Sequence, residues 1–261
     1  MTLAYDGTDY VGWQRQANGV SIQALIEDAL LALDGREVMV AGAGRTDAGV
    51  HALGQVAAFT IARELDPGAL VRALNAHLPH AIRVLAAEFA PPAFHPRYGA
   101  RTKTYRYRLW NGDVMSPFER RYAWHVPGPL DVESMHAAAR LLEGRHDFAA
   151  FQATGSSVAT KEREIMISTL FTTEDTVDTE EELSFRGGDL VTYEVTGTGF
   201  LRHMVRIIVG SLIEVGRGRQ PVEWISDVIA SGNRAMAGPT APPDGLFLVR
   251  VEYPDALAAG S

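Results

Sequence analysis

Hydrophobic and polar positions recur along this chain with two periods, and each period predicts a different element. Runs with every second residue apolar, or rich in β-branched and aromatic residues, predict strands. Runs with an apolar residue every three to four positions predict helices. The predicted strands are residues 2–5, 38–40, 55–61, 83–89, 104–110, 168–173, 190–196 and 247–253. The predicted helices are residues 21–33, 69–78, 132–144, 203–215 and 221–232.

Capping signals support the helices. Ser21 and Asp131 are candidate N-caps, Pro67 precedes the second helix, and Gly232 ends the last one. Consecutive strands outnumber strand–helix–strand crossovers, so the predicted class is α+β with antiparallel sheets. The proline-rich segment 90–100 is the best candidate boundary. It divides the chain into an N-terminal half (1–97), a C-terminal half (98–254) and a tail (255–261).

Composition excludes several classes of chemistry. Cysteine is absent from the 261 residues, which rules out disulfides, thiolate zinc sites and a cysteine nucleophile. No apolar run is long enough for a membrane span, and the N-terminus "MTLAYDGTDYVGWQRQ" lacks the features of a signal peptide. The predicted location is therefore cytoplasmic, with no membrane partner.

The net charge of −8 argues at first against a nucleic-acid partner. Charge is nevertheless segregated: residues 95–125 carry seven Arg or Lys against two carboxylates, and residues 200–220 carry four Arg against one. Acid is concentrated in residues 174–189, which we interpret as an exposed hairpin tip. The two basic stretches are either ordinary solvated faces or contacts for phosphate.

One arginine and one aspartate stand out in the stretch "AGAGRTDAGVHALGQVAAF", which starts at Ala41. Arg45 and Asp47 lie in a small-residue loop between two predicted strands, a place from which a scaffold can project a carboxylate. The alternative is that Asp47 closes a turn through its side chain. A metal site shared with His51 is disfavoured, because no further ligand lies at suitable spacing nearby.

The strand "KTYRYRLW" would place Tyr105, Tyr107 and Leu109 on one face. The simplest interpretation, preferred for Tyr107, is an aromatic core face, and the alternative is a stacking platform for RNA bases. In the apolar helix "HMVRIIVGSLIEV", Arg206 needs an anionic partner. Asp47 and Glu214 are both candidates for that partner, and the sequence does not decide between them.

These motifs together resemble the tRNA pseudouridine synthase A family. The resemblance runs in order through "YDGTDYVGWQRQ", "GRTDAGVHA", "FHPRYGARTKTYRY", "FLRHMVRIIVGSLIEVGRG" and "APPDGLFLVRVEY". It implies two similar α+β halves around a central antiparallel sheet, and a homodimer that needs no metal and no cofactor. It implies isomerisation of uridine to pseudouridine at positions 38–40 of the tRNA anticodon stem-loop.

The resemblance also implies roles for individual residues. Asp47 matches the catalytic aspartate, Arg45 the arginine that displaces the target base, and Tyr105 the tyrosine that packs on the uracil. Arg206 matches the arginine that pairs with the aspartate. The basic stretches add three further predicted substrate-binding residues, which are Arg101, Lys103 and Arg202.

Two other functions remain as alternatives. A non-catalytic RNA-binding protein of the same fold would not need Asp47, which is present. A glycoside hydrolase would need two cooperating carboxyl groups, whereas this motif supplies one together with an arginine.

Overall fold

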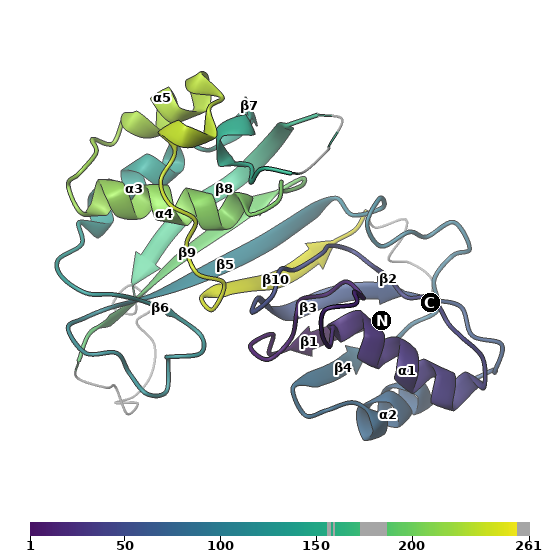
Figure 1. Ribbon diagram of the computed structural model, residues 1–261. Helices are drawn as coiled ribbons and strands as arrows, with labels where there is room; N and C mark the ends of the chain where they lie inside the picture. Colours follow the sequence, from purple (N-terminus) through teal and green to yellow (C-terminus); the bar gives the residue numbers. More distant parts are fainter. Residues whose placement is uncertain (156–157, 159, 173–186, 255–261) are drawn as a thin grey trace. The chain divides into compact units, whose positions relative to one another are not determined.

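The computed structural model describes residues 1–155, 158, 160–172 and 187–254 (Figure 1). The chain folds as two compact units, one formed by Met1–Lys103 with the C-terminal segment from Phe247, and the other by Thr104–Leu246. Each unit combines strands with helices, and the pairing between strands is mostly antiparallel. The fold is therefore α+β, as the sequence predicts.

The strands of the first unit follow the order β4-β1-β3-β10. β1 (Thr2–Tyr5) pairs antiparallel with β3 (His51–Ala58) and with β4 (Ile82–Ala86). β10 (Leu246–Glu252) runs parallel to β3, and the two-residue β2 (Ala41–Gly42) pairs with the end of β3. The segment between β2 and β3 is the small-residue loop that carries Arg45 and Asp47.

Two helices pack in the first unit, where α1 (Ile22–Asp34) lies beside α2 (Pro67–His77) and α2 also packs on β4 (Figure 1). Ser21 caps α1 by accepting the Ala24 N–H, and Asp66 caps α2 by accepting the Ala69 N–H. Apolar side chains on the inner face of α1, among them Ile22, Ile26 and Leu30, are buried. The predicted amphipathic pattern is confirmed.

The strands of the second unit follow the order β5-β9-β8-β7. They are β5 (Thr102–Asn111), which begins in the first unit, β9 (Asp189–Gly197), β8 (Glu162–Thr172) and β7 (Gly144–Asp147), with the short β6 (Trp124–Val126) beside β5. The helices are α3 (Val132–Arg140), α4 (Met204–Gly216) and α5 (Trp224–Ser231), with single 3-10 turns at Ala149–Phe151 and Arg234–Met236. α3 packs on both β8 and α4.

One predicted strand is wrong. Residues 38–40 form no strand, although Val38 and Val40 are buried on either side of the exposed Met39. Side chains of α1 take the place of a neighbouring strand: Glu27 accepts the Val40 N–H at 3.2 Å, and Gln23 donates to the Val40 carbonyl at 2.9 Å. The alternating pattern therefore predicts burial here and not a sheet ladder.

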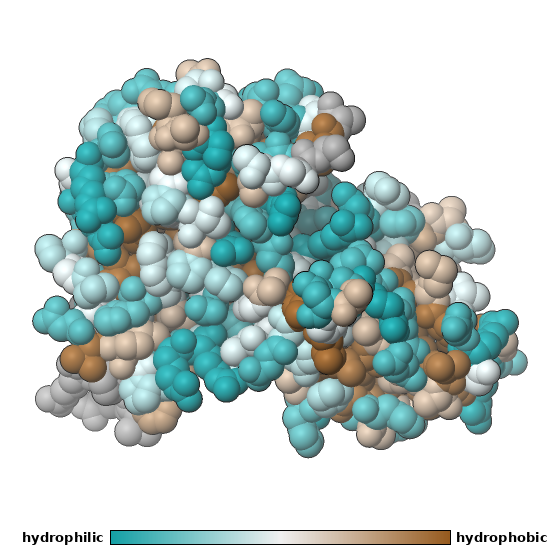
Figure 2. Space-filling model, viewed as in Figure 1, coloured by the Kyte–Doolittle hydropathy of each residue, from teal (hydrophilic) through white to brown (hydrophobic). Residues whose placement is uncertain are grey.

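Most of the predicted acidic hairpin tip lies outside the described residues, but β8 and β9 on either side of it are antiparallel partners. Hydrophilic residues cover most of the face of each unit shown in Figure 2, and hydrophobic residues appear there in separate groups. Within the described part of the chain, every helix is too short or too polar to cross a membrane.

Candidate active site

Residues 43–50, which we call the GRTD loop, are held by their backbone. Four of the loop's carbonyl groups accept hydrogen bonds, two from long side chains and two from main-chain N–H groups. The pairs are Lys103 Nζ to Ala43 O (2.6 Å), Gln55 Nε2 to Gly44 O (2.9 Å), Trp13 N to Thr46 O (3.0 Å) and Val50 N to Asp47 O (3.1 Å). The first three donors lie outside the loop, so a loop of small residues, which has little side chain to bury, is held by its surroundings.

Two glycines of the N-terminal motif let the chain approach this loop closely. A Cβ added at Gly7 would lie 2.0 Å from the Val50 carbonyl oxygen, and one added at Gly12 would lie 2.5 Å from the Thr46 carbonyl oxygen. Gly12 also has a φ of +102°, which favours glycine. The motif "YDGTDYVGW" therefore supports the GRTD loop from one side.

Arg45 is exposed and Asp47 is half-buried, and the backbone that carries them is held by the hydrogen bonds above. The turn after Asp47 is closed by the Val50 N–H on the Asp47 carbonyl, with Gly49 at a φ of +78°. Closing this turn needs a main-chain oxygen and does not depend on a carboxylate. The two interpretations of Asp47, as a catalytic carboxylate and as a turn-forming side chain, both stay predictions.

A buried polar network lies under the loop. The Tyr5 hydroxyl is 2.8 Å from Thr46 Oγ1, and Gln55 Nε2 is 3.4 Å from the same Tyr5 hydroxyl. Burial raises the pKa of Tyr5 to about 12, although its hydrogen bonds act in the opposite direction. Tyr5 is therefore neutral at physiological pH and ties Thr46, the neighbour of Asp47, to the sheet.

His51 packs inside the first unit. Its ring is 1% exposed, stacks on Phe247 with 4.6 Å between ring centroids, and accepts the Gly7 N–H at Nδ1. Among the described residues, no three His, Cys, Asp or Glu side chains are grouped so that they could hold a metal ion.

The remaining predicted residues of the first unit differ in environment. Arg101 is exposed, and its backbone N–H donates to the Glu252 carbonyl at 2.7 Å. Lys103 is half-buried, and burial, together with the charge of Arg97, lowers its pKa to about 8. The Lys103 ammonium donates to the Ala43 carbonyl and thus contacts the GRTD loop itself.

The second unit carries Tyr105, Arg202 and Arg206. Tyr105 on β5 is 8% exposed, and the Phe200 ring meets it edge-on at a centroid distance of 4.9 Å. Tyr107 is fully buried and donates its hydroxyl to the Pro242 carbonyl at 2.7 Å. The core interpretation of Tyr107 is confirmed. Arg202 is exposed just before α4.

Arg206 is anchored on α4, whose other residues are mostly buried. Its Nε donates to the Ala241 carbonyl at 2.7 Å, and the Ala241 N–H donates to the Arg206 carbonyl at 3.1 Å. Glu214 lies two helical turns away, about 12 Å along the axis, and pairs with Arg219 at 3.1 Å. Glu214 is therefore excluded as the partner of Arg206.

Two arginines of the basic strand are already neutralised inside the second unit. Arg106 pairs with Glu194 at 2.8 Å and Arg108 pairs with Glu119 at 2.9 Å. The basic appearance of this stretch in sequence overstates the charge that is available to phosphate.

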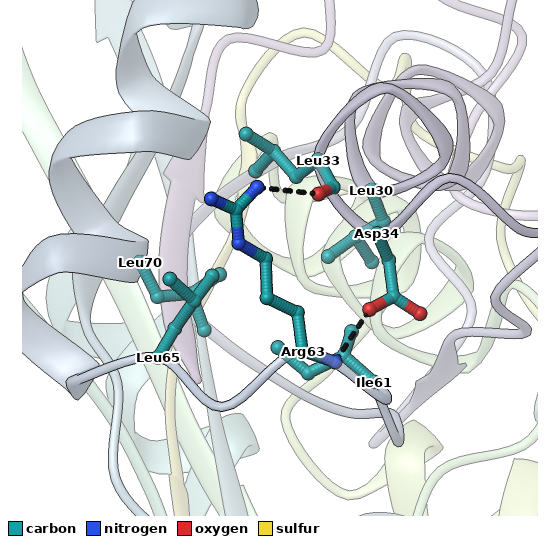
Figure 3. Close-up of a pocket in the computed structure, with 7 residues that line it drawn as sticks. All are labelled: Leu30, Leu33, Asp34, Ile61, Arg63, Leu65 and Leu70. Atoms are coloured by element: carbon teal, nitrogen blue, oxygen red, sulfur yellow. Dashed lines mark hydrogen bonds between the residues drawn. The ribbon is translucent and has the colours of Figure 1, made fainter.

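Two hollows, one in each unit, are lined by residues other than the predicted catalytic ones. The hollow in Figure 3, between the end of α1 and residues 61–70, leaves no room for a water molecule. Asp34 accepts the Arg63 N–H there, and Arg63 donates to the Leu33 carbonyl, so its polar groups are satisfied (Figure 3). A wider depression of about 510 Å³ in the second unit lies between Asp131 and Val222.

Comparison with known proteins identifies the family. The model of the family described as "tRNA pseudouridine synthase" matches residues 1–99 and 138–254. The chain belongs to the tRNA pseudouridine synthase family. Proteins named tRNA pseudouridine synthase A are 48% identical in Myxococcus xanthus, over 99% of this chain and 93% of that one, and 46% identical in Syntrophotalea carbinolica, over 97% and 95%. The protein of that name in Moorella thermoacetica is 44% identical, over 97% and 98%.

Within this family member, the predicted site residues divide between the two units. Arg45, Asp47, Arg101 and Lys103 belong to the first unit, and Tyr105, Arg202 and Arg206 to the second. The pairing of Asp47 with Arg206 stays a prediction. The sequence analysis missed Tyr5 and Gln55, for which the available signal was a polar group at a buried strand position.

Proposed function

We propose that this protein isomerises uridine to pseudouridine at positions 38–40 of the tRNA anticodon stem-loop, with Asp47 as the catalytic carboxylate. One observation carries the proposal: in a member of the tRNA pseudouridine synthase family, the motif "GRTDAGVHA" forms a loop whose backbone is held by several hydrogen bonds and carries the half-buried Asp47. A preorganised carboxylate is what attack on a ribose carbon requires.

The reaction breaks the bond between C1′ and N1 of the target uridine and forms a bond between C1′ and C5. C5 loses its proton and N1 gains one, so the product is an isomer, and neither redox chemistry nor a second substrate is needed. Asp47 either attacks C1′ or assists removal of the C2′ proton.

The other predicted residues serve this step. The target base must leave its stack before C1′ can be reached, and Arg45, which is exposed two residues before Asp47, takes the vacated position. Tyr105 packs on the flipped uracil and assists the transfer of the C5 proton. Arg206, whose Nε is fixed by the Ala241 carbonyl, keeps Asp47 ionised. Arg101 and Arg202, both exposed, bind phosphates.

The assay is tritium release from C5-labelled uridine in tRNA transcripts that carry a single uridine at position 38, 39 or 40. Release from these transcripts, with none from a transcript that has cytidine at all three positions, is the expected result. A protein that binds tRNA tightly without releasing tritium from any transcript would instead be the non-catalytic RNA-binding protein.

We also propose that the protein works as a homodimer in the cytoplasm. A stem-loop covers more surface than one unit offers, and the net charge of −8 limits the basic area of one chain. Light scattering at micromolar concentration is expected to give twice the mass of 28.3 kDa. A mass of one chain would contradict the dimer.

A further inference from the structure

Two long side chains of the first unit donate hydrogen bonds to consecutive carbonyl groups of the GRTD loop. Gln55, in the middle of β3, holds Gly44, and Lys103, on β5, holds Ala43. These donors lie 11 and 60 residues from their acceptors along the chain. Because the two carbonyls are adjacent, the two bonds fix successive peptide planes immediately before Arg45, and with them the direction in which the chain enters Asp47.

Burying the Gln55 side chain lowers the folding stability, compared with an apolar side chain at the same position. Its side chain is fully buried, and Oε1 has no hydrogen-bond partner within the described residues. A buried acceptor without a partner costs about 1–3 kcal/mol, whereas an apolar side chain of the same size would fill the position without that cost. The useful contribution of Gln55 is its Nε2, which reaches Gly44 and, at 3.4 Å, the Tyr5 hydroxyl.

Partial burial of the Lys103 ammonium also costs folding free energy. Its ammonium is half-buried, and no carboxylate in the described part of the chain forms an ion pair with it. Burial and the nearby Arg97 lower its pKa to about 8, so the folded environment disfavours the charged form of Lys103. The ammonium is nevertheless directed onto the Ala43 carbonyl at 2.6 Å, the length of a charge-assisted hydrogen bond.

We propose that Gln55 and Lys103 are positioning residues, which hold the Gly44 and Ala43 carbonyls so that Asp47 points at the ribose, and that Lys103 acts on the loop and not on an RNA phosphate. The inference rests on the proposed function, in which Asp47 reacts with that ribose. It replaces the substrate-binding role that the sequence favoured for Lys103. Both residues should therefore govern turnover and leave tRNA affinity alone.

The test uses Gln55→Met and Lys103→Met, which keep the length of the side chain and remove its donor. The matched controls are Asn75→Leu, which removes an amide that bridges α2 to β4 in the same unit, and Lys161→Met, which removes the chain's other lysine, exposed in the second unit. Each protein is assayed for kcat by tritium release and for tRNA Kd at several salt concentrations. Hydrogen exchange of the residue 43–50 amides is measured without RNA.

The proposal expects kcat to fall about tenfold to a hundredfold in both variants, because a displacement of about 1 Å can cost that much. Kd and its salt slope should match the wild type, and exchange should accelerate in residues 43–50 but not in the controls. A weaker Kd for Lys103→Met, with a salt slope lower by about 0.7–0.9 and unchanged kcat, would make Lys103 a phosphate ligand and overturn the proposal.

The hydrogen-exchange measurement separates this inference from the proposed function. If the wild type releases no tritium, the proposed function fails, and exchange in residues 43–50 alone decides whether the two side chains fix the loop. Unchanged exchange in both variants would overturn the inference whatever the activity. If Gln55→Met does not fold, Lys103→Met decides by itself, because a half-exposed position tolerates an apolar side chain.

Discussion

Replacement of Tyr5 by phenylalanine should lower turnover more than its effect on stability explains. Tyr5 is only 4% exposed, and its hydroxyl lies 2.8 Å from Oγ1 of Thr46, the residue before Asp47. Tyr193 in the second unit offers a matched control, since it is fully buried and its hydroxyl lies 2.9 Å from Ser168 Oγ. Burial raises the pKa of both phenols, so both are neutral at pH 7.

The two substitutions remove the same kind of bond. Each leaves a buried Ser or Thr hydroxyl without its tyrosine partner, which costs about 1–3 kcal/mol of folding free energy. Urea unfolding should therefore show similar losses for Tyr5→Phe and Tyr193→Phe. Only Tyr5→Phe releases the GRTD loop, so its kcat should fall about tenfold or more, while Tyr193→Phe keeps the wild-type kcat.

The assay is tritium release at saturating tRNA, with filter binding for affinity, at a temperature where both variants are fully folded. Equal kcat values for the two variants, with equal losses of stability, would refute the reasoning, because Tyr5 would then act on the fold alone. A weaker tRNA affinity in Tyr5→Phe would also contradict it, since the hydroxyl is buried beneath the loop.

Three further predictions test other parts of the site. Gly12→Ala should lower both stability and turnover, because the added Cβ would lie 2.5 Å from the Thr46 carbonyl oxygen of the loop. The control Gly35→Ala, at a φ of +73° with open space around it, should cost only about 1 kcal/mol of stability. Urea unfolding measures the stability of both variants, and tritium release measures their turnover. Tyr105→Phe should keep tRNA affinity and lose most turnover, and full activity would reduce Tyr105 to packing. Arg101→Ala should lower the salt slope of tRNA binding by about 0.7–0.9. Arg106→Gln should lower the slope less, because Arg106 already forms an ion pair in the structure. Equal changes of slope in filter binding would contradict this difference.

The sequence predicted elements best where local signals determine them. The strand at residues 2–5 has the predicted bounds, and Ser21 and Asp131 cap their helices as expected. β3 begins at His51, earlier than predicted, because its first residues pair with β10 and β1, which lie far away in sequence. β7 was missed because "GRHD" has no apolar alternation and is a strand only through its pairing with β8.

In the candidate site, too, residues marked by a local sequence signal could be predicted, whereas contacts between distant residues could not. Arg45 and Asp47 are visible in sequence, because two charges in a run of small residues are conspicuous. The hold of Lys103 on Ala43 joins residues 60 positions apart, and local periodicity carries no information about such a bond. The neutralisation of Arg106 by Glu194, 88 positions away, was hidden for the same reason.

Asp47→Asn tests the central claim most directly, because it keeps the size of the side chain and removes its charge. Tritium release from C5-labelled uridine in a tRNA transcript is compared with that of wild type, with filter binding in parallel and Asp28→Asn, an exposed acid on α1, as the control. The account predicts unchanged tRNA affinity and a rate lower by several orders of magnitude for Asp47→Asn alone. A rate within about tenfold of wild type, equivalent to about 1.4 kcal/mol in the barrier, would contradict it.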